Sequence, residues 1–552
     1  MDCCSSCDRS GGRYRGWHGN DLALHCEEES LLHAKLAQQR SVLPQGLGFQ
    51  ASSSKFSQGA QCCGTFCGCC CLTVLVVLIW LIATCQVTVF GTTFNLFNYY
   101  WPVTTYLIAG RKDDVALIDW YNSLPPVSEG VVAGPGPNTR SYHSWQAAHD
   151  QLAEWGPRSK VGTFKRYNEL GITIQNDLVW PELQTIALGL PNTDHGFVRP
   201  ILVNALDKAR NSNAECDGSS CWNMQWLRKV FRERLGTLDY VASSDMKWIM
   251  TVVLHKVLLN IDLTDEEAKD FASWMTMFIL PQPLPKKWVD NPISNWAFAE
   301  ARILQVKESL IEKYKEAILL KWPQFDGQVN SREVTLLASA VCDALALAGG
   351  LSVPTVLDFM IALLFMEKSP AGFVRLEDLS GGGAKLHNFM LETMRRYAPV
   401  AGVPGWTTDD NGATWQQQIP NLQMAMLDAS VFPEPLAFQP GRPGLNYDDE
   451  SLSMSWAEPS DFNDDASDVD SHSCPGKDLS VQMISAFIQE LAQSGPWEVD
   501  SDQITLTFYG TSGWLLRRAG AISEEPDHPL PDEPVCTCLP MFCMFVYEAD
   551  FR

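Results

Sequence analysis

The stretch His472-Ser-Cys-Pro-Gly-Lys-Asp-Leu-Ser480 places a single cysteine, Cys474, directly before a predicted helix. Backbone N–H groups at the start of such a helix can donate hydrogen bonds to the sulfur and favour the thiolate. Most Cys-Pro-Gly turns are structural, so the stretch indicates a thiolate ligand only if the rest of the chain supports it. The apolar residues of the helix recur at helical spacing, at Leu479, Ile484, Phe487, Ile488 and Leu491.

Three upstream patterns accompany the cysteine. Glu392 and Arg395 lie three positions apart on a predicted helix over 386–397, so they share one face; an ordinary surface ion pair is the alternative. A segment rich in proline and glycine follows, from Asp428 to Arg442. A long apolar helix is predicted from 334 to 365, with a kink or local unwinding at Gly349, Gly350 and Pro354.

In order and spacing, these patterns and Cys474 resemble the C-terminal half of cytochrome P450 enzymes. The resemblance implies haem b as the cofactor, with Cys474 as the axial thiolate ligand of the iron and Gly476 beside it. It also implies that Arg442 joins Glu392 and Arg395 in a structural group behind the haem. The likeness extends over about residues 120 to 520.

Further matches concern the residues that bind the haem propionates, the segment over the haem and a C-terminal hairpin. Asp194-His195-Gly-Phe-Val-Arg199 resembles the helix whose His and Arg hold the haem propionates, and carboxylates are well held by such donors. His472 matches the position of another propionate partner. Ala348-Gly349-Gly350 resembles the distal segment that passes over the haem, and an alternating pattern at 504–508, a turn at 510–513 and residues 514–516 predict a β-hairpin where the family has one.

Two departures from the family pattern affect the expected chemistry. Ser467 and Asp470 stand where the family usually has Phe and Gly, and they lie in an acidic insert, 447–470, which is predicted to be unstructured. Leu351 and Ser352 stand where monooxygenases have an acid followed by Thr, which relay protons to iron-bound dioxygen. A substrate that already carries an O–O bond does not need that relay.

Three functions therefore remain open, with Gly349, Gly350, Leu351 and Ser352 as the distal catalytic segment. The first is a monooxygenase acting on a hydrophobic, lipid-like substrate, with a reductase or ferredoxin as its partner; the acidic insert would repel an acidic partner. The second is an electron-independent fatty-acid hydroperoxide isomerase, dehydratase or lyase, similar to the allene oxide synthase and hydroperoxide lyase branch. The third is a non-catalytic haem-binding protein.

Composition excludes some other classes. A formal net charge of −24 argues against a nucleic-acid surface, which needs Lys and Arg to neutralise phosphate. Hydrophobic residues make up 46% of the chain, which is too many for a disordered protein. Between residues 86 and 535 only Cys216, Cys221, Cys342 and Cys474 occur. Cys216 and Cys221 are close enough to pair, but two free thiols are favoured, as in a reducing compartment.

The N-terminal region predicts a membrane anchor. No charged residue occurs from 56 to 110, and 69–90 is long enough to cross a hydrocarbon core of about 30 Å. A buried core helix is the alternative. The run starts too far from the N-terminus for a signal peptide. The family's usual site makes the endoplasmic reticulum the expected membrane, with another organelle membrane as the alternative because a 68-residue Cys-rich leader is atypical for the family. Six cysteines between 62 and 71 favour palmitoylation, with apolar packing or a zinc site as alternatives.

The predicted architecture is mainly α with a small β region, a cytochrome P450 fold preceded by one transmembrane helix. Amphipathic helices are expected over 261–277, where Thr264 and Glu267 have capping-box spacing, and over 298–320. The predicted organisation is a Cys-rich leader over 1–68, the transmembrane helix over 69–90, a connecting segment over 91–119, the catalytic domain over 120–523 and a Pro-, acid- and Cys-rich tail over 524–552.

Overall fold

The structure is a computed structural model. It describes residues 86–89, 92–95, 114–133, 139–154, 192–206, 215–279, 296–372, 374–400, 402, 405–408, 415–456, 474–500, 504–507 and 510–520. The chain divides into two compact units, 1–78 and 79–552, and every described residue belongs to the second. The leader, the tail, most of the predicted membrane span and the thiols between 62 and 71 therefore lie outside the described residues.

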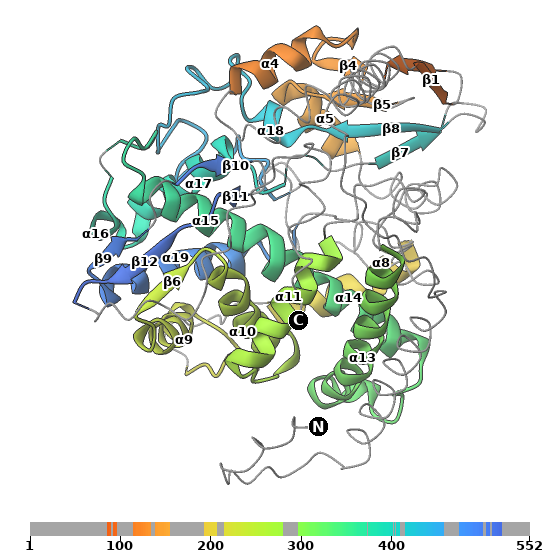
Figure 1. Cartoon of the computed structure of the whole chain (residues 1–552). Coiled ribbons are helices and arrows are strands. Elements are labelled where there is room, and N and C mark those ends of the chain that lie inside the picture. The colour runs from red at the N-terminus through yellow and green to blue at the C-terminus, as the bar shows by residue number, and fades with distance from the viewer. Residues whose placement is uncertain are drawn as a thin grey trace, which may run out of the picture. The chain divides into compact units, whose positions relative to one another are not determined.

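The core of the second unit is built around one interrupted helix (Figure 1). It consists of α14 (Arg332–Leu347), a π-helical turn η5 (Ala348–Ser352) and α15 (Val353–Phe365). The predicted interruption is thus confirmed. Among the described residues, this helix is the one that is long and apolar enough to cross a membrane, but it is mostly buried inside the protein, as a core helix is.

Three helices pack around this core helix: α10 (Asp245–Leu259), α11 (Asp265–Ile279) and α13 (Trp296–Lys321). The capping box at the start of α11 is confirmed. The Thr264 backbone N–H donates to Glu267 Oε2 at 3.0 Å, and the Glu267 N–H donates to Thr264 Oγ1 at 3.2 Å. The short helix η4 (Pro323–Phe325) connects α13 to α14.

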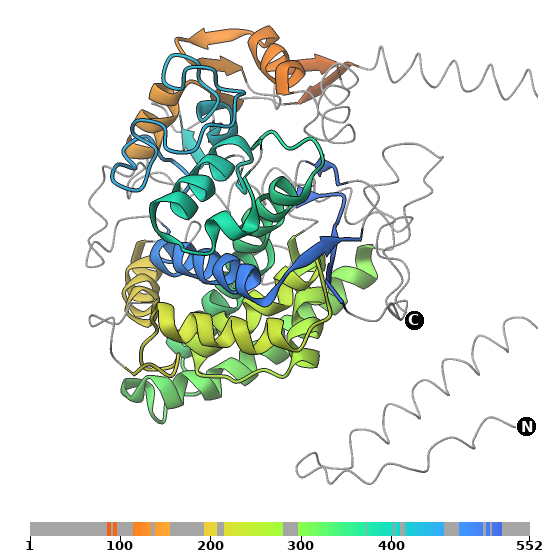
Figure 2. The same ribbon diagram turned by 90° about the vertical axis from the view of Figure 1, so that its left-hand side faces the viewer.

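A second group of helices carries the Cys474 region. The helix after the cysteine is α19 (Lys477–Ser494), and it packs along α9 (Met224–Gly236); both lie in the lower half of Figure 2. Glu490 of α19 joins them by accepting hydrogen bonds from Arg228 at 2.5 Å and Arg232 at 2.9 Å. The helices α16 (Leu376–Leu379) and α17 (Gly383–Arg396) pack against α19 and α15 respectively.

The strands form small sheets beside the helices. The largest consists, in spatial order, of β3 (Pro126–Ser128), β4 (Val131–Ala133), β5 (Thr139–Tyr142), β8 (Trp415–Pro420) and β7 (Gly405–Thr408). Strands β5 and β8 are parallel, and the other neighbouring pairs are antiparallel. The helices α4 (Asp114–Ser123), α5 (Trp145–Glu154) and α18 (Leu422–Ala425) lie with this sheet at the top of Figure 1. The mainly α prediction with a small β region is confirmed.

The predicted C-terminal hairpin is present with different bounds. Strands β10 (Leu506–Thr507) and β11 (Gly510–Thr511) pair, so the second strand begins earlier than predicted. The next strand, β12 (Leu515–Arg518), pairs instead with β6 (Tyr240–Ala242) and β9 (Trp497–Val499). Alternation within a segment predicts a strand but not its partner, which the tertiary fold supplies.

Three other expectations need correction. The end of the predicted membrane helix is wrong, because Gln86–Val89 forms strand β1, paired with β2 (Thr92–Asn95); both are rich in β-branched residues, which favour strands. The acidic insert is not wholly unstructured, since 447–456 is folded and Met454 is fully buried. The preference for two free thiols is also wrong, because Cys216 and Cys221 form a disulfide. A short loop holds their Cα atoms 5.2 Å apart.

Candidate active site

The Glu392 and Arg395 pair lies near the C-terminal end of α17. Both side chains are almost fully buried, at 1% and 0% exposure, so the alternative of a surface ion pair is wrong. Arg395 Nε and Nη2 each donate to a different oxygen of Glu392, both at 2.8 Å. Arg442 Nε donates to Glu392 Oε1 at 3.2 Å. The three side chains therefore meet, as the resemblance implied.

This buried group also holds the segment that precedes Arg442. Arg395 Nη1 donates to the Met426 carbonyl oxygen at 2.8 Å. Arg442 donates to the carbonyl oxygens of Pro433 at 2.6 Å and Ala437 at 2.8 Å. Burial lowers the pKa of Arg395, and the hydrogen bonds and charge of Glu392 oppose that shift. Because buried charges need partners, the network ties α17 to residues 426–442.

Cys474 lies at the entrance to α19. Its side chain is exposed and forms no disulfide. Its backbone N–H donates to the Trp456 carbonyl oxygen at 3.1 Å, and its own carbonyl oxygen accepts from Lys477 N–H at 3.3 Å. Gly476 is the N-cap, and a methyl group added there would lie 3.9 Å from the Cys474 sulfur, at ordinary contact. Cys474 thus stands at the N-terminal, positive end of α19.

The folded part of the acidic insert lies against this entrance. Glu450 pairs with His387 of α17 at 2.7 Å and with Lys477 of α19 at 3.2 Å. Burial opposes ionisation of Glu450, but His387 and Lys477 outweigh it and hold its pKa below the usual range. The Trp145 indole N–H donates to the Leu452 carbonyl oxygen at 3.0 Å. These long-range contacts explain why 447–456 is folded despite its composition.

His195 and Arg199 lie one turn apart on helix α8 (Asn192–Leu206), with only 2% and 4% of each residue exposed. Asp194 accepts two hydrogen bonds from Arg332, at 2.9 and 2.7 Å, which ties the start of α8 to the start of α14. A buried His and Arg on one helical face is a donor set for carboxylates. The expected third donor, His472, lies outside the described residues.

The distal segment forms the π-helical turn η5. Gly349 and Gly350 are buried, whereas Leu351 and Ser352 are partly buried. A methyl group at Gly349 would lie 3.1 Å from Leu254 Cδ1 of α10, so this glycine allows α10 to approach the turn closely. The helix is therefore interrupted at the turn on which α10 packs.

Two carboxylates in the core helix were not predicted. Asp343 of α14 pairs with Lys307 of α13 at 2.6 Å, with both side chains at 0% exposure. Asp358 of α15 accepts from Thr511 N–H at 2.7 Å, Thr511 Oγ1 at 2.9 Å and Trp514 Nε1 at 2.7 Å. Burial raises the pKa of Asp358 to about 6. Single acids within an apolar helical run were the signal available in the sequence.

No family model and no curated protein matches the sequence. Solved structures do. Ligand-free CYP164A2 of Mycobacterium smegmatis matches with a TM-score of 0.51 and 14% identity, over 76% of this chain and 100% of that chain. Epothilone D-bound cytochrome P450epoK matches with a TM-score of 0.51 and 14% identity, over 73% of this chain and 95% of that chain. A mutant of P450 EryK in complex with erythromycin B matches with a TM-score of 0.50 and 14% identity, over 76% of this chain and 99% of that chain.

At 14% identity these matches establish the fold alone. The activity has to be inferred from the residues of the site. The core helix with its interruption, the buried group on α17 and the cysteine before α19 lie within a fold that those structures share. This chain has the cytochrome P450 fold.

Proposed function

We propose that this chain is a haem-thiolate oxidoreductase of the cytochrome P450 type that acts on a small hydrophobic substrate. The observation that carries the proposal is Cys474, whose exposed sulfur lies at the N-terminal end of the buried helix α19. The buried group of Glu392, Arg395 and Arg442 supports the same interpretation. Monooxygenation is the activity we place first.

The residues present fit haem b. The cofactor needs one strong axial donor for its iron and donors for two propionates. Cys474 supplies a thiol at a helix N-terminus, and His195 and Arg199 supply buried donors on one face of α8. When bound, haem would supply an iron that activates or cleaves an O–O bond. The chain itself fixes the Cys474 backbone through the Trp456 carbonyl oxygen, and α19 starts directly after Gly476.

The thiolate assignment can be tested by spectroscopy. Reduced protein exposed to carbon monoxide should show the red-shifted Soret band of thiolate ligation, and Cys474→Ala should abolish it. Cys342→Ala is the matched control, because Cys342 is the other described cysteine outside the disulfide and is fully buried. Persistence of the band in Cys474→Ala would refute the ligand assignment.

A second candidate is an electron-independent fatty-acid hydroperoxide isomerase, dehydratase or lyase. Leu351 stands where a monooxygenase has an acid, and the two carboxylates Asp343 and Asp358 of the core helix are already engaged. Asp343 is paired with Lys307, and Asp358 is held by Thr511 and Trp514. Reductive cleavage of dioxygen consumes protons, whereas a hydroperoxide substrate brings its O–O bond already reduced.

Substrate supply distinguishes the candidates. Purified protein is mixed with a fatty-acid hydroperoxide in the absence of NADPH and of any reductase. Turnover there supports the second candidate, whereas oxygen uptake that depends on NADPH and a reductase supports monooxygenation. Haem binding without either activity would favour the third function, a non-catalytic haem-binding protein.

We also propose membrane attachment through the apolar segment that starts at residue 69, with the endoplasmic reticulum as the expected membrane. Support comes from the sequence alone, because 56–110 contains no charged residue. Deletion of residues 1–85 should move the protein from the membrane fraction to the supernatant after alkaline carbonate extraction. Retention in the membrane would contradict this proposal.

A further inference from the structure

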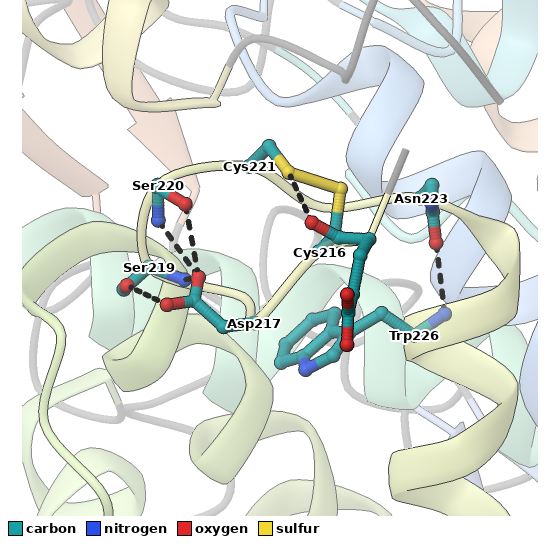
Figure 3. Close-up of a disulfide and its surroundings, with 8 residues drawn as sticks. Cys216, Asp217, Ser219, Ser220, Cys221, Asn223 and Trp226 are labelled. Carbon is teal, nitrogen blue, oxygen red and sulfur yellow. Dashed lines mark hydrogen bonds between the residues drawn. A yellow bond between two sulfur atoms is a disulfide. The ribbon is translucent and has the colours of Figure 1, made fainter. Parts of the chain in front are cut away.

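Between α8 and α9 lies a short loop, residues 215–221, closed by the disulfide between Cys216 and Cys221 (Figure 3). The two Cα atoms lie 5.2 Å apart. Both cysteines are half-buried, so they are within reach of other thiols. The proposed haem site does not use them.

Within this loop, hydrogen bonds on Asp217 set the backbone path. Its carboxylate accepts from Ser219 N–H at 2.9 Å and Oγ at 2.8 Å, and from Ser220 N–H at 3.0 Å and Oγ at 3.1 Å (Figure 3). The backbone N–H of Ser220 and these other donors hold the pKa of Asp217 well below its usual range. The Gly218 N–H donates to the Cys221 carbonyl oxygen at 3.0 Å. The loop therefore turns back on itself through contacts other than the sulfur bond.

Three neighbouring helices hold the loop in place. Gly218 has a φ of +86°, and a Cβ there would lie 2.1 Å from the Trp226 ring of α9. Lys321, the last residue of α13, donates to the Ser219 carbonyl oxygen at 3.3 Å. The Trp222 indole N–H donates to the carbonyl oxygen of Leu206, the last residue of α8, at 2.9 Å. These contacts raise the effective concentration of each thiol near the other, so the bridge forms readily in the presence of an oxidant.

We propose that Cys216 and Cys221 are an oxidation site in the cell, and that the unit beginning at Ile79 therefore lies in an oxidising compartment. The co-reactant is the oxidised dithiol of a thiol–disulfide oxidoreductase. One S–S bond of that catalyst breaks and one forms here; the two thiols lose two electrons and two protons, which reduce the catalyst to its dithiol. Such a bridge persists outside the cytosol, where glutathione and thioredoxin do not keep thiols reduced.

This inference goes beyond the proposed function and does not depend on haem. It also states on which side of the membrane the unit lies, since an oxidising compartment is the lumen or the cell exterior. If the proposed oxidoreductase does receive electrons from a protein donor, that donor must reach it from the same side.

Peptide mapping reads the thiol state directly. Trypsin should release residues 211–228, which contain Cys216 and Cys221 and no other cysteine, and residues 333–368, which contain only Cys342. The full chain is expressed in eukaryotic cells, and the cells are quenched in acid, denatured and treated with N-ethylmaleimide. We expect the first peptide to carry no maleimide and the second to carry one. Two maleimides on the first peptide would overturn the proposal.

A second measurement tests the side of the membrane. Leu320→Cys introduces a thiol at a side chain that is 86% exposed on α13, outside the proposed haem site. Sealed vesicles with their cytosolic face outward are treated with a membrane-impermeant maleimide, and the tryptic peptide 316–321 is examined. We expect labelling only after detergent is added. Labelling of intact vesicles would overturn the proposal, and neither measurement requires haem binding or activity.

Discussion

Arg395 and Glu392 are joined by two hydrogen bonds of 2.8 Å, with both side chains removed from solvent. Arg442, fifty positions along the chain from Glu392, adds a third bond to the same carboxylate at 3.2 Å. A buried carboxylate that serves two guanidinium groups is sensitive to the loss of either one, because the remaining charge cannot regain its solvation. Stability measurements should therefore detect this group even without the cofactor.

Replacing Arg395 by Met leaves the Glu392 charge buried with one partner fewer. We expect the free energy of unfolding to fall by about 3–5 kcal/mol. The matched control is Arg517→Met, because Arg517 pairs with Glu498 at 3.2 Å on the surface. That change should cost about 0–1 kcal/mol. Equal losses in chemical denaturation of the two variants would contradict the special role of the buried pair.

Lys307 and Asp343 should behave as a coupled pair. Lys307→Met alone leaves the buried Asp343 carboxyl group without its partner at 2.6 Å, and we expect a loss of about 3–5 kcal/mol. The double variant Lys307→Met/Asp343→Leu removes both charges from the interface between α13 and α14, so it should recover most of that loss. A double-mutant cycle by urea denaturation measures the coupling. A loss in the double variant equal to the sum of the losses in the two single variants would show that the two residues act independently.

Asp358 should make stability depend on pH. Burial raises its pKa in the folded protein to about 6, above the ordinary value of 3.8, and its hydrogen bonds and the charge of Lys247 only partly oppose the shift. A carboxyl with a raised pKa favours the folded state most below pH 3.8. That contribution is lost as the pH rises through about 6, and it amounts to about 2–3 kcal/mol.

The measurement is the difference in unfolding free energy between the wild type and Asp358→Asn at several pH values from 4 to 7. Other carboxyl groups contribute equally to both proteins, so they cancel in the difference. We expect the wild type to lose stability relative to the variant as the pH rises. A difference that stays constant over this range would show that Asp358 has an ordinary pKa.

Gly218 and Gly327 allow the disulfide loop to be tested against a matched glycine. Both have a positive φ, +86° and +75°, but only Gly218 faces a neighbour, the Trp226 ring. Gly327→Ala should cost only the backbone strain, about 1–2 kcal/mol. Gly218→Ala must also displace the loop from the ring, so we expect a larger loss and slower reoxidation of the reduced thiols. Similar losses in thermal unfolding would mean that the loop does not pack on Trp226 in solution.

The sequence by itself determined the local features of this protein. Helical periodicity and caps located α11, α13 and α19, and the two glycines located the interruption at η5, because these signals come from residues within a few positions of one another. The spacing of Glu392 and Arg395 determined that they share a helical face. The resemblance of these motifs to those of cytochrome P450 enzymes then suggested what Cys474 does.

Only the tertiary structure decided which distant groups meet. Asp343 and Lys307 are separated by 36 positions, and Asp358 and Thr511 by 153, so no local pattern could pair them. The insert at 447–456 has a composition typical of disorder, yet Glu450 gains partners on two helices. Burial of a charge depends on what the rest of the chain places around it. For that reason the sequence could identify these acids but could not predict their partners.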